Sequence, residues 1–196
     1  MSKQKNAIVN LFFAGVGGQG LVLSNQIQAR AALLAGFDVK TSDVYGLAMR
    51  GGSVYGFNRF GDQVLSSTFA AGLGDILVAL EPLEGLRYLP LLRAGGRVVL
   101  NTRAVLPSTV LLEKQDYPAD PEQLFTQAGL VVDSLDALSL SLQAGNAKMT
   151  NVAMLGALSL RLPQIPVSAY TQAIEELVPA KLVAANCQAF ELARRE

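Results

Sequence analysis

The sequence contains no histidine and a single cysteine, Cys187, in 196 residues. Without imidazoles and with one thiol, the chain cannot assemble a zinc site, an iron–sulfur cluster, a Ser-His-Asp triad or a Cys-His pair from its own residues. A disulfide within the chain is equally excluded. Cys187 lies in a helical pattern, where we expect a small core residue and not a nucleophile. These kinds of site are therefore excluded for the chain on its own.

Charge is also scarce. Charged residues make up 16% of the chain, against roughly 25% in an average soluble domain. The 16 basic and 16 acidic residues cancel, and no run of one sign provides the electrostatic footprint that nucleic-acid binding needs. The scarcity favours an obligate interface with another protein. The alternative is that a parallel sheet covered on both faces simply needs many apolar residues.

Long hydrophobic runs are missing as well. No apolar segment reaches the roughly 20 residues that a membrane-spanning helix needs before Gly, Pro or a charge interrupts it. The apolar stretch near the N-terminus runs directly into a glycine turn, and no small-residue cleavage site follows it, so it predicts a first strand and not a signal peptide. We expect a cytoplasmic protein with one domain over residues 1–196, since no linker or repeat divides the chain.

Strand and helix patterns alternate along most of the chain. Apolar and alternating runs predict strands, whereas 3.6-residue spacing predicts helices that end near Gly or Pro. Four helical patterns follow the last predicted strand. The expected strands are 7–14, 37–41, 53–60, 63–67 (a hairpin with 53–60), 75–80, 97–101 and 130–133, and the expected helices are 21–35, 82–92, 121–128, 136–143, 149–160, 168–177 and 179–194.

This order predicts an α/β fold: a Rossmann-like, mostly parallel sheet with helices on both faces and a helical C-terminal cap. In such folds, ligands bind beyond the carboxyl ends of the strands. The turn at 15–20 and a loop predicted at 42–52 both emerge at that edge.

The turn GVGGQG, residues 15–20, follows a strand and precedes a helix. Gly15, Gly17 and Gly20 match GxGxxG, a pattern that permits a tight turn, close main-chain approach and a helix N-terminus facing an anion. The same glycines would also serve tight packing beside a partner. A dinucleotide-binding protein of this fold is expected to carry an acidic residue at the end of the second strand, where it binds the ribose. Asp38 and Asp43 match that position only approximately.

Five segments together resemble one protein family. They are GVGGQG (15–20), SDVYGLAMRGGSV (42–54), EPLEGLRYLPLL (81–92), GGRVVLNT (95–102) and GNAKMTNVAMLGAL (145–158). In combination they are similar to the gamma subunit, or the corresponding fused domain, of the 2-oxoacid:ferredoxin oxidoreductases. The segments at 81–92 and 145–158 look most like indolepyruvate oxidoreductase beta subunits.

The resemblance implies an enzyme that oxidatively decarboxylates a 2-oxoacid with coenzyme A and passes electrons to ferredoxin, using thiamine diphosphate and iron–sulfur clusters. It implies that this chain is a non-catalytic subunit, inactive alone, which packs on the subunit that holds those cofactors. A stand-alone protein that binds a dinucleotide or an adenylate is the alternative. A symmetric homodimer formed when the partner is missing is a third possibility.

The family resemblance also indicates candidate site residues. A guanidinium such as that of Arg50 offers a planar fork for a carboxylate or phosphate, although a solvated loop arginine is the alternative. Tyr45 stands where the relatives typically have His. Asn146, Lys148 and Asn151 surround the start of an apolar helix, where helix capping and anion attraction are alternatives. The full candidate set for cofactor binding or the partner interface is Gly15, Gly17, Gly18, Gln19, Gly20, Asp43, Tyr45, Arg50, Gly51, Gly52, Asn146, Lys148 and Asn151.

Overall fold

A six-stranded sheet forms the centre of the protein in a computed structural model, which describes residues 7–45, 52–106 and 117–195. The spatial order of its strands is β2-β3-β1-β4-β5-β6. Strand β1 therefore has β3 on one side and β4 on the other. The strands are β1 (Val9–Val16), β2 (Asp38–Tyr45), β3 (Ser53–Gly61), β4 (Gly74–Ala79), β5 (Leu92–Asn101) and β6 (Val131–Leu135).

Most strands of this sheet run in one direction. The pairs β1–β4, β4–β5 and β5–β6 are parallel. Strand β3 is antiparallel to both β1 and β2, so β2 runs the same way as β1 and only β3 is reversed. The predicted mostly parallel α/β sheet is confirmed, and the carboxyl ends of five strands meet at one edge.

The predicted hairpin is wrong. Residues 63–67 form no strand, and β3 instead pairs with β2 and β1. The segment after the Gly61 turn is held by other bonds: the Val64 N–H donates to Asp38, and Arg59 donates to the carbonyls of Ser66 and Thr68. Alternation identified β3 as a strand but could not identify its partners.

Two other boundaries also differ from the predictions. Residues 42–45 belong to β2 and not to a loop, because they pair in register with β3. The helix expected over 82–92 is interrupted: α2 ends at Leu86, a 3-10 turn follows at Leu89–Leu91, and β5 already begins at Leu92. Pro90 lacks the N–H that a continuing helix would need.

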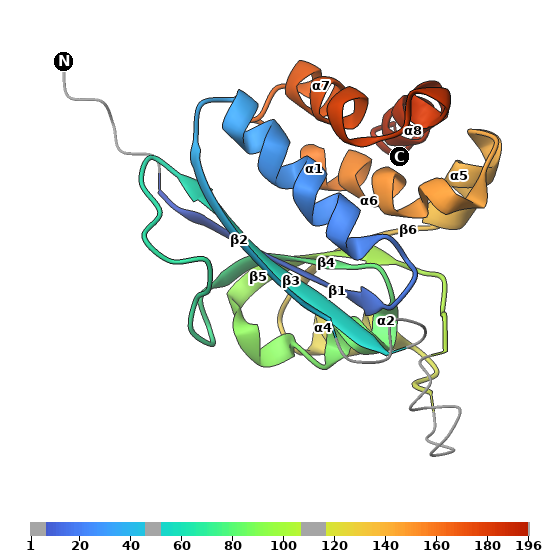
Figure 1. Cartoon of the computed structure of the whole chain (residues 1–196). Helices are drawn as coiled ribbons and strands as arrows, with labels where there is room; N and C mark the ends of the chain where they lie inside the picture. The colour runs from blue at the N-terminus through green and yellow to red at the C-terminus, as the bar shows by residue number, and fades with distance from the viewer. Residues whose placement is uncertain (1–6, 46–51, 107–116, 196) are drawn as a thin grey trace.

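Helices cover both faces of the sheet (Figure 1). Helices α1 and α5 to α8 lie on one face, and α2 and α4 on the other. The predicted C-terminal helical cap therefore packs beside α1. The helices are α1 (Leu21–Leu34), α2 (Pro82–Leu86), α4 (Pro121–Gln127), α5 (Ala137–Gln143), α6 (Thr150–Ser159), α7 (Val167–Leu177) and α8 (Ala180–Ala193), with short 3-10 turns η1 (Leu89–Leu91) and η2 (Ala147–Met149).

The sheet separates two hydrophobic clusters. Alternate residues of β1 point to opposite faces, as strand geometry requires. Phe13 packs under α1 and α6 in the larger cluster, whereas Phe12 packs against Phe125 of α4 in the smaller one. In the larger cluster, α6 is buried nearly all round, and a Cβ on Gly156 would meet the Phe190 carbonyl of α8, so that only glycine fits this crossing.

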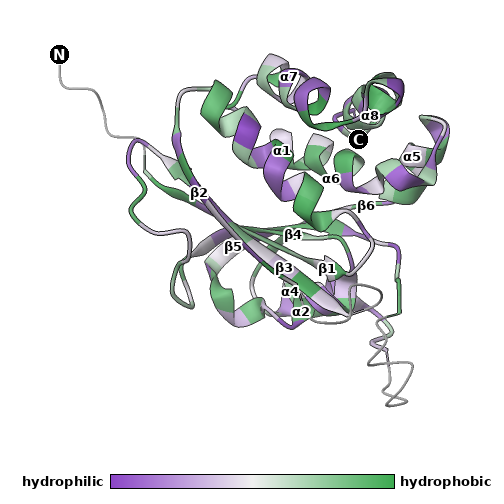
Figure 2. Ribbon diagram, viewed as in Figure 1, coloured by the Kyte–Doolittle hydropathy of each residue, from purple (hydrophilic) through white to green (hydrophobic). Residues whose placement is uncertain are grey.

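The helix α1 has an unusual inner face. Its buried positions include Ser24, Asn25 and Gln28, and Figure 2 shows hydrophilic stretches along this helix above the apolar sheet. These side chains are partly satisfied across the interface. Asn25 Oδ1 accepts from Asn58 Nδ2 of β3 at 2.8 Å, and Gln28 accepts from Tyr170 of α7 at 2.7 Å. No helix in the ranges that the structure describes is both long and apolar enough to cross a bilayer.

Candidate functional site

The glycine turn between β1 and α1 is braced by a side chain of its own. Gln19 Oε1 accepts from the Val16 N–H at 2.7 Å, and Gln19 Nε2 donates to the Leu80 carbonyl at 3.1 Å, which ties the turn to the end of β4. The Gly17 N–H donates to the Gly52 carbonyl at 2.8 Å. The turn is thereby fixed between its two neighbouring strands.

Three glycines of this turn meet different requirements. A Cβ on Gly15 would lie 2.8 Å from Gln19 Oε1 and 3.0 Å from Leu80 Cβ, so Gly15 permits the close approach of β1 and β4. Gly18 and Gly20 have φ angles of 100° and 76°, in the left-handed region that L side chains rarely adopt. A Cβ on Gly20 would also lie 2.8 Å from Asn151 Nδ2. The turn therefore presents main chain without side chains.

The start of α6 is clamped onto this turn. Asn151 Nδ2 donates to the Gly20 carbonyl at 3.1 Å, and Ser24 Oγ of α1 donates to the Asn151 carbonyl at 3.3 Å. Asn146 Oδ1 accepts from the Lys148 N–H at 2.9 Å and so caps η2, just before α6. Two motifs far apart in the sequence, the glycine turn and the segment 146–151, are thus neighbours.

A cavity of about 610 Å³ lies between these two motifs. We call it the cationic cavity, because its charged lining side chains are Arg103 and Lys148, and the described residues place no carboxylate in its wall. Neither cation forms an ion pair with a residue in the described part of the chain. Its lining residues are Gly18, Gln19, Gly20, Leu23, Leu80, Asn101, Arg103, Val105, Leu138, Ala147, Lys148, Thr150 and Asn151.

One helix begins without a cap at the wall of the cationic cavity. The helix α1 starts after Gly20 and has neither a side-chain cap nor an acid in its first turn. The helix α6 instead continues from η2, which Asn146 caps, and the Thr150 N–H donates to the Ala147 carbonyl. Glu81, Asp120 and Asp136 cap α2, α4 and α5. Uncapped N-termini carry partial positive charge and free N–H groups, which favour an anion. The positive charges of Arg103 and Lys148 and the N-terminus of α1 therefore all favour an anion in this cavity.

Of the remaining candidate residues, Arg50 and Gly51 fall outside the described part of the chain. Asp43 of β2 accepts from Asn25 Nδ2 of α1 at 2.6 Å, and partial burial raises the pKa of this carboxyl. Its bond with Asn25 gives it a packing role, away from the cavity wall. Tyr45 ends β2, opposite Val54 in the register, and Gly52 touches the turn through its carbonyl.

A buried acidic pair lies next to the site, and the sequence analysis did not identify it. Glu81 and Glu84 are fully buried. Glu81 accepts from the Glu84 N–H at 2.8 Å and from the Tyr117 hydroxyl, while Arg87 donates to Glu84 at 3.1 Å. Burial raises the pKa of Glu81. These bonds cap α2 and secure the chain near Tyr117, so we assign the pair a structural role.

Arg103 was also missed from the sequence. It lies two residues beyond the end of β5, and an available signal was its position just past the carboxyl end of a parallel strand, where ligand-binding residues collect. Its main chain is fixed by Asn101, whose side-chain oxygen accepts from the Arg103 N–H, and whose Nδ2 donates to the Leu80 carbonyl. The end of β5 thus positions Arg103 beside the glycine turn.

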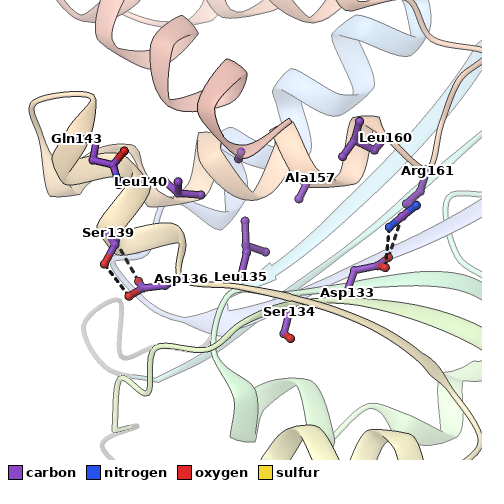
Figure 3. A pocket seen from close by; sticks show the side chains of 11 residues that line it. Asp133, Ser134, Leu135, Asp136, Ser139, Leu140, Gln143, Ala157, Leu160 and Arg161 are labelled. Carbon is purple, nitrogen blue, oxygen red and sulfur yellow. Dashed lines mark hydrogen bonds and ion pairs between the residues drawn. The ribbon is translucent and has the colours of Figure 1, made fainter. Parts of the chain in front are cut away.

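A second cavity, of about 320 Å³, lies over β6 and beneath α5, α6 and α8 (Figure 3). We call it the β6 cavity. Its acidic side chains are hydrogen-bonded within the fold: Asp133 accepts from both Arg97 and Arg161, at 2.7–2.9 Å, and Asp136 accepts from the main chain and hydroxyl of Ser139. The arrangement offers a ligand few unsatisfied groups.

Comparisons with known proteins agree on one family. The model of the pyruvate ferredoxin/flavodoxin oxidoreductase family matches residues 10–196. The chain is 36% identical over 188 residues to the indolepyruvate oxidoreductase subunit IorB of Thermococcus kodakarensis, covering 93% of each chain. It is 37% identical over 191 residues to IorB of Pyrococcus horikoshii, again covering 93% of each.

A solved structure shows the same fold. The pyruvate oxidoreductase subunit PORC of Thermotoga maritima superposes with a TM-score of 0.71 at 25% identity, covering 98% of this chain and 97% of that one.

Proposed function

The chain belongs to the pyruvate ferredoxin/flavodoxin oxidoreductase family as a small subunit, and from this premise we propose that it holds the phosphates of coenzyme A for a 2-oxoacid oxidoreductase. The proposed reaction is the oxidative decarboxylation of a 2-oxoacid, with ferredoxin as electron acceptor. The relatives named IorB favour indolepyruvate as the 2-oxoacid. We further propose a cytoplasmic enzyme, as expected from the sequence.

The observation that carries the coenzyme A proposal is the cationic cavity. Arg103 and Lys148, which form no ion pair with a described residue, and the uncapped N-terminus of α1 line a space of about 610 Å³ beside an exposed glycine main chain. Phosphates are the ligand groups that such an arrangement favours. Coenzyme A would supply the thiol that accepts the acyl group, while the residues of this chain would bind and orient its anionic end.

The redox cofactors do not fit this chain. Iron–sulfur clusters need several cysteine ligands, and the sequence has one cysteine and no histidine. No group of three or more potential metal ligands lies together among the residues that the structure describes. We therefore propose that a partner subunit holds these cofactors, and that the low charge content of this chain reflects an obligate interface with that subunit.

The alternative of a stand-alone dinucleotide- or adenylate-binding protein is not favoured. The relatives that match nearly the whole chain are named as subunits of oxidoreductases. In addition, Asp43, one of the two acids considered for a ribose contact, is engaged with Asn25 of α1.

Reconstitution tests this proposal. The chain is assembled with its large subunit, and 2-oxoacid-dependent reduction of ferredoxin is measured while coenzyme A is varied. Arg103→Ala with Lys148→Ala is expected to raise the KM for coenzyme A on the order of 100-fold, since a charge-assisted contact contributes about 1.5–3 kcal/mol. The KM for the 2-oxoacid is expected to stay unchanged.

A matched control removes two exposed cations elsewhere, with Lys181→Ala and Arg195→Ala on the C-terminal helix and its end. This double variant is expected to keep the wild-type KM for coenzyme A. Equal effects of the two double variants would contradict a role for the cationic cavity. Turnover by the isolated chain would contradict its assignment as a non-catalytic subunit.

A further inference from the structure

A third cavity, of about 430 Å³, lies at the edge of the sheet opposite to the glycine turn. Its wall is formed by the first residues of β1, β4 and β5 and by the chain that follows α6. Because β1, β4 and β5 run parallel, their first residues meet at one edge, while the glycine turn follows the last residue of β1. We call this space the arginine cavity, since Arg93, Arg97 and Arg161 line it.

Guanidinium groups outnumber carboxylates around the arginine cavity. Arg93 Nε donates to Asp75 at 2.8 Å. Arg97 and Arg161 share a single carboxylate, that of Asp133, at 2.7–2.9 Å, and Figure 3 shows the Arg161 side of this pair. Three guanidinium groups are thus paired with two carboxylates, which leaves an excess of one positive charge in this group of described side chains.

The same pairing leaves hydrogen-bond donors unused. Arg97 binds Asp133 through Nη1, Arg161 binds it through Nε and Nη2, and Arg93 binds Asp75 through Nε. The other N–H groups of these arginines have no acceptor among the described residues. Because the carboxylates fix one side of each guanidinium, the remaining donors are already oriented, and less side-chain entropy is lost when an oxyanion binds.

The floor of the arginine cavity is apolar. Ile76 and Leu162 are buried, whereas Ile8 is 37% exposed and leaves apolar surface open to a ligand. Such a floor favours an apolar group next to the charged one, because burying apolar surface is the main gain it can offer. The cavity therefore combines the two kinds of contact that small organic anions use.

We infer that the arginine cavity binds a small organic anion: a carboxylate or phosphate ester whose oxyanion accepts from the arginines and whose apolar body lies against Ile8 and Ile76. The excess positive charge supports an anion, and the apolar floor supports an organic one. This site lies at the other edge of the sheet from the cationic cavity, so the inference goes beyond the proposed binding of coenzyme A and does not depend on it.

Calorimetry tests the inference with phenyl phosphate, phenylacetate and inorganic phosphate, on the full chain and on its complex with the large subunit. All proteins carry Arg103→Ala with Lys148→Ala, so that the cationic cavity contributes no binding. At least one phenyl probe is expected to bind about tenfold more tightly than inorganic phosphate, which corresponds to burying on the order of 55 Å² of apolar surface. The tighter of the two phenyl probes identifies the oxyanion as a phosphate ester or a carboxylate.

Two variants remove the site in different ways. Arg93→Gln with Arg161→Gln is expected to weaken binding of the tighter phenyl probe about 30-fold, because solvent weakens each of the charge-assisted contacts that are lost. Lys181→Gln with Arg195→Gln is the matched control and is expected to keep the affinity. Ile8→Glu leaves the arginines in place but adds an acid beside them, and it is expected to abolish binding, whereas Leu33→Glu, at an exposed position of α1, is expected to have no effect.

Three outcomes would overturn the inference. Neither phenyl probe might bind the background protein more tightly than inorganic phosphate does, so that the apolar floor is unused. The arginine double variant and Ile8→Glu might both keep the wild-type affinity, so that the arginines only link β4, β5 and β6. Binding to the isolated chain might be lost in the complex, so that the large subunit covers the cavity. None of these results bears on coenzyme A, whose KM is measured separately with Arg103→Ala and Lys148→Ala in the assembled enzyme.

Discussion

The cationic cavity and the β6 cavity both have charged side chains in their walls, but these charges are paired to different extents. In the β6 cavity, Asp133 is shared by Arg97 and Arg161 (Figure 3). In the cationic cavity, Arg103 and Lys148 form no close ion pair with a described residue, and the charge of Arg103 acts only at longer range, on Asp136. A polar hollow by itself is therefore a weak sign of a binding site, and unneutralised charge of one sign is a stronger one.

The same contrast extends to the helix ends. Asp136 caps α5 at the β6 cavity, whereas α1 begins without a side-chain cap at the cationic cavity. A side-chain cap typically contributes about 1 kcal/mol, so α1 lacks this stabilisation. An anion bound there would restore part of it, in proportion to its concentration.

The largest expected effect comes from breaking the packing at the cationic cavity. Gly20→Ala places a Cβ at φ 76° and 2.8 Å from Asn151 Nδ2. Backbone strain and displacement of the Asn151 clamp are together expected to lower the free energy of unfolding by about 2–3 kcal/mol. Urea denaturation measures this loss.

Gly36→Ala is the matched control for that variant. Gly36 also has a positive φ, 89°, but an added Cβ there meets nothing within 4 Å. The control is expected to lose only about 1 kcal/mol, the cost of the left-handed backbone. Equal losses for the two variants would show that the contact between the turn and α6 contributes little.

A smaller effect is expected from the β6 cavity. Asp133→Asn removes the carboxylate that two arginines share, and partial exposure of all three side chains limits the loss to about 1 kcal/mol of unfolding free energy. The KM for coenzyme A in the assembled enzyme is expected to stay at the wild-type value. A raised KM would show that the two cavities are coupled, and the contrast between them would no longer hold.

The smallest expected effect is a pH dependence at Asp136. Hydrogen bonds from Ser139 lower the pKa of this carboxyl below 3.8. A lowered folded-state pKa gives stability that is present above the unfolded pKa and is lost as the pH falls through the folded pKa, here below about pH 4. Asp136→Asn keeps a capping oxygen, so it is expected to cost about 0.5 kcal/mol at pH 7.

Urea denaturation of wild type and Asp136→Asn between pH 7 and pH 3 measures this difference. It is expected to shrink toward the acid end of the range. A difference that stays constant with pH would mean that the charge on Asp136 does not matter to the cap.

Periodicity alone predicted most of the fold. The alternation of strands and helices identified the parallel sheet, because apolar runs such as 75–80 are buried on both faces. Pairing was not predictable in the same way. The segment 42–45 is polar enough to resemble a loop, and only its register with β3 makes it a strand; the turn at Gly61 suggested a hairpin with 63–67 that tertiary contacts override.

The candidate site was predicted in part. The glycine turn and the segment with Asn146, Lys148 and Asn151 were found through their motifs, and the structure brings them together. Arg103 was not found, because no local pattern distinguishes it from a solvated loop residue. Its role depends on the neighbourhood of β5 and α6, which local sequence patterns do not encode.

The bonding of the glycine turn limits how it can hold an anion. The N–H groups of Gly17 and Gln19 already donate to the carbonyls of Gly52 and Val16. These two N–H groups are therefore not available to bind a phosphate. Attraction then depends more on the side chains of Arg103 and Lys148, in an open space where dissolved ions screen them. The affinity for the proposed anionic ligand is accordingly expected to fall as salt is added to the surrounding solution.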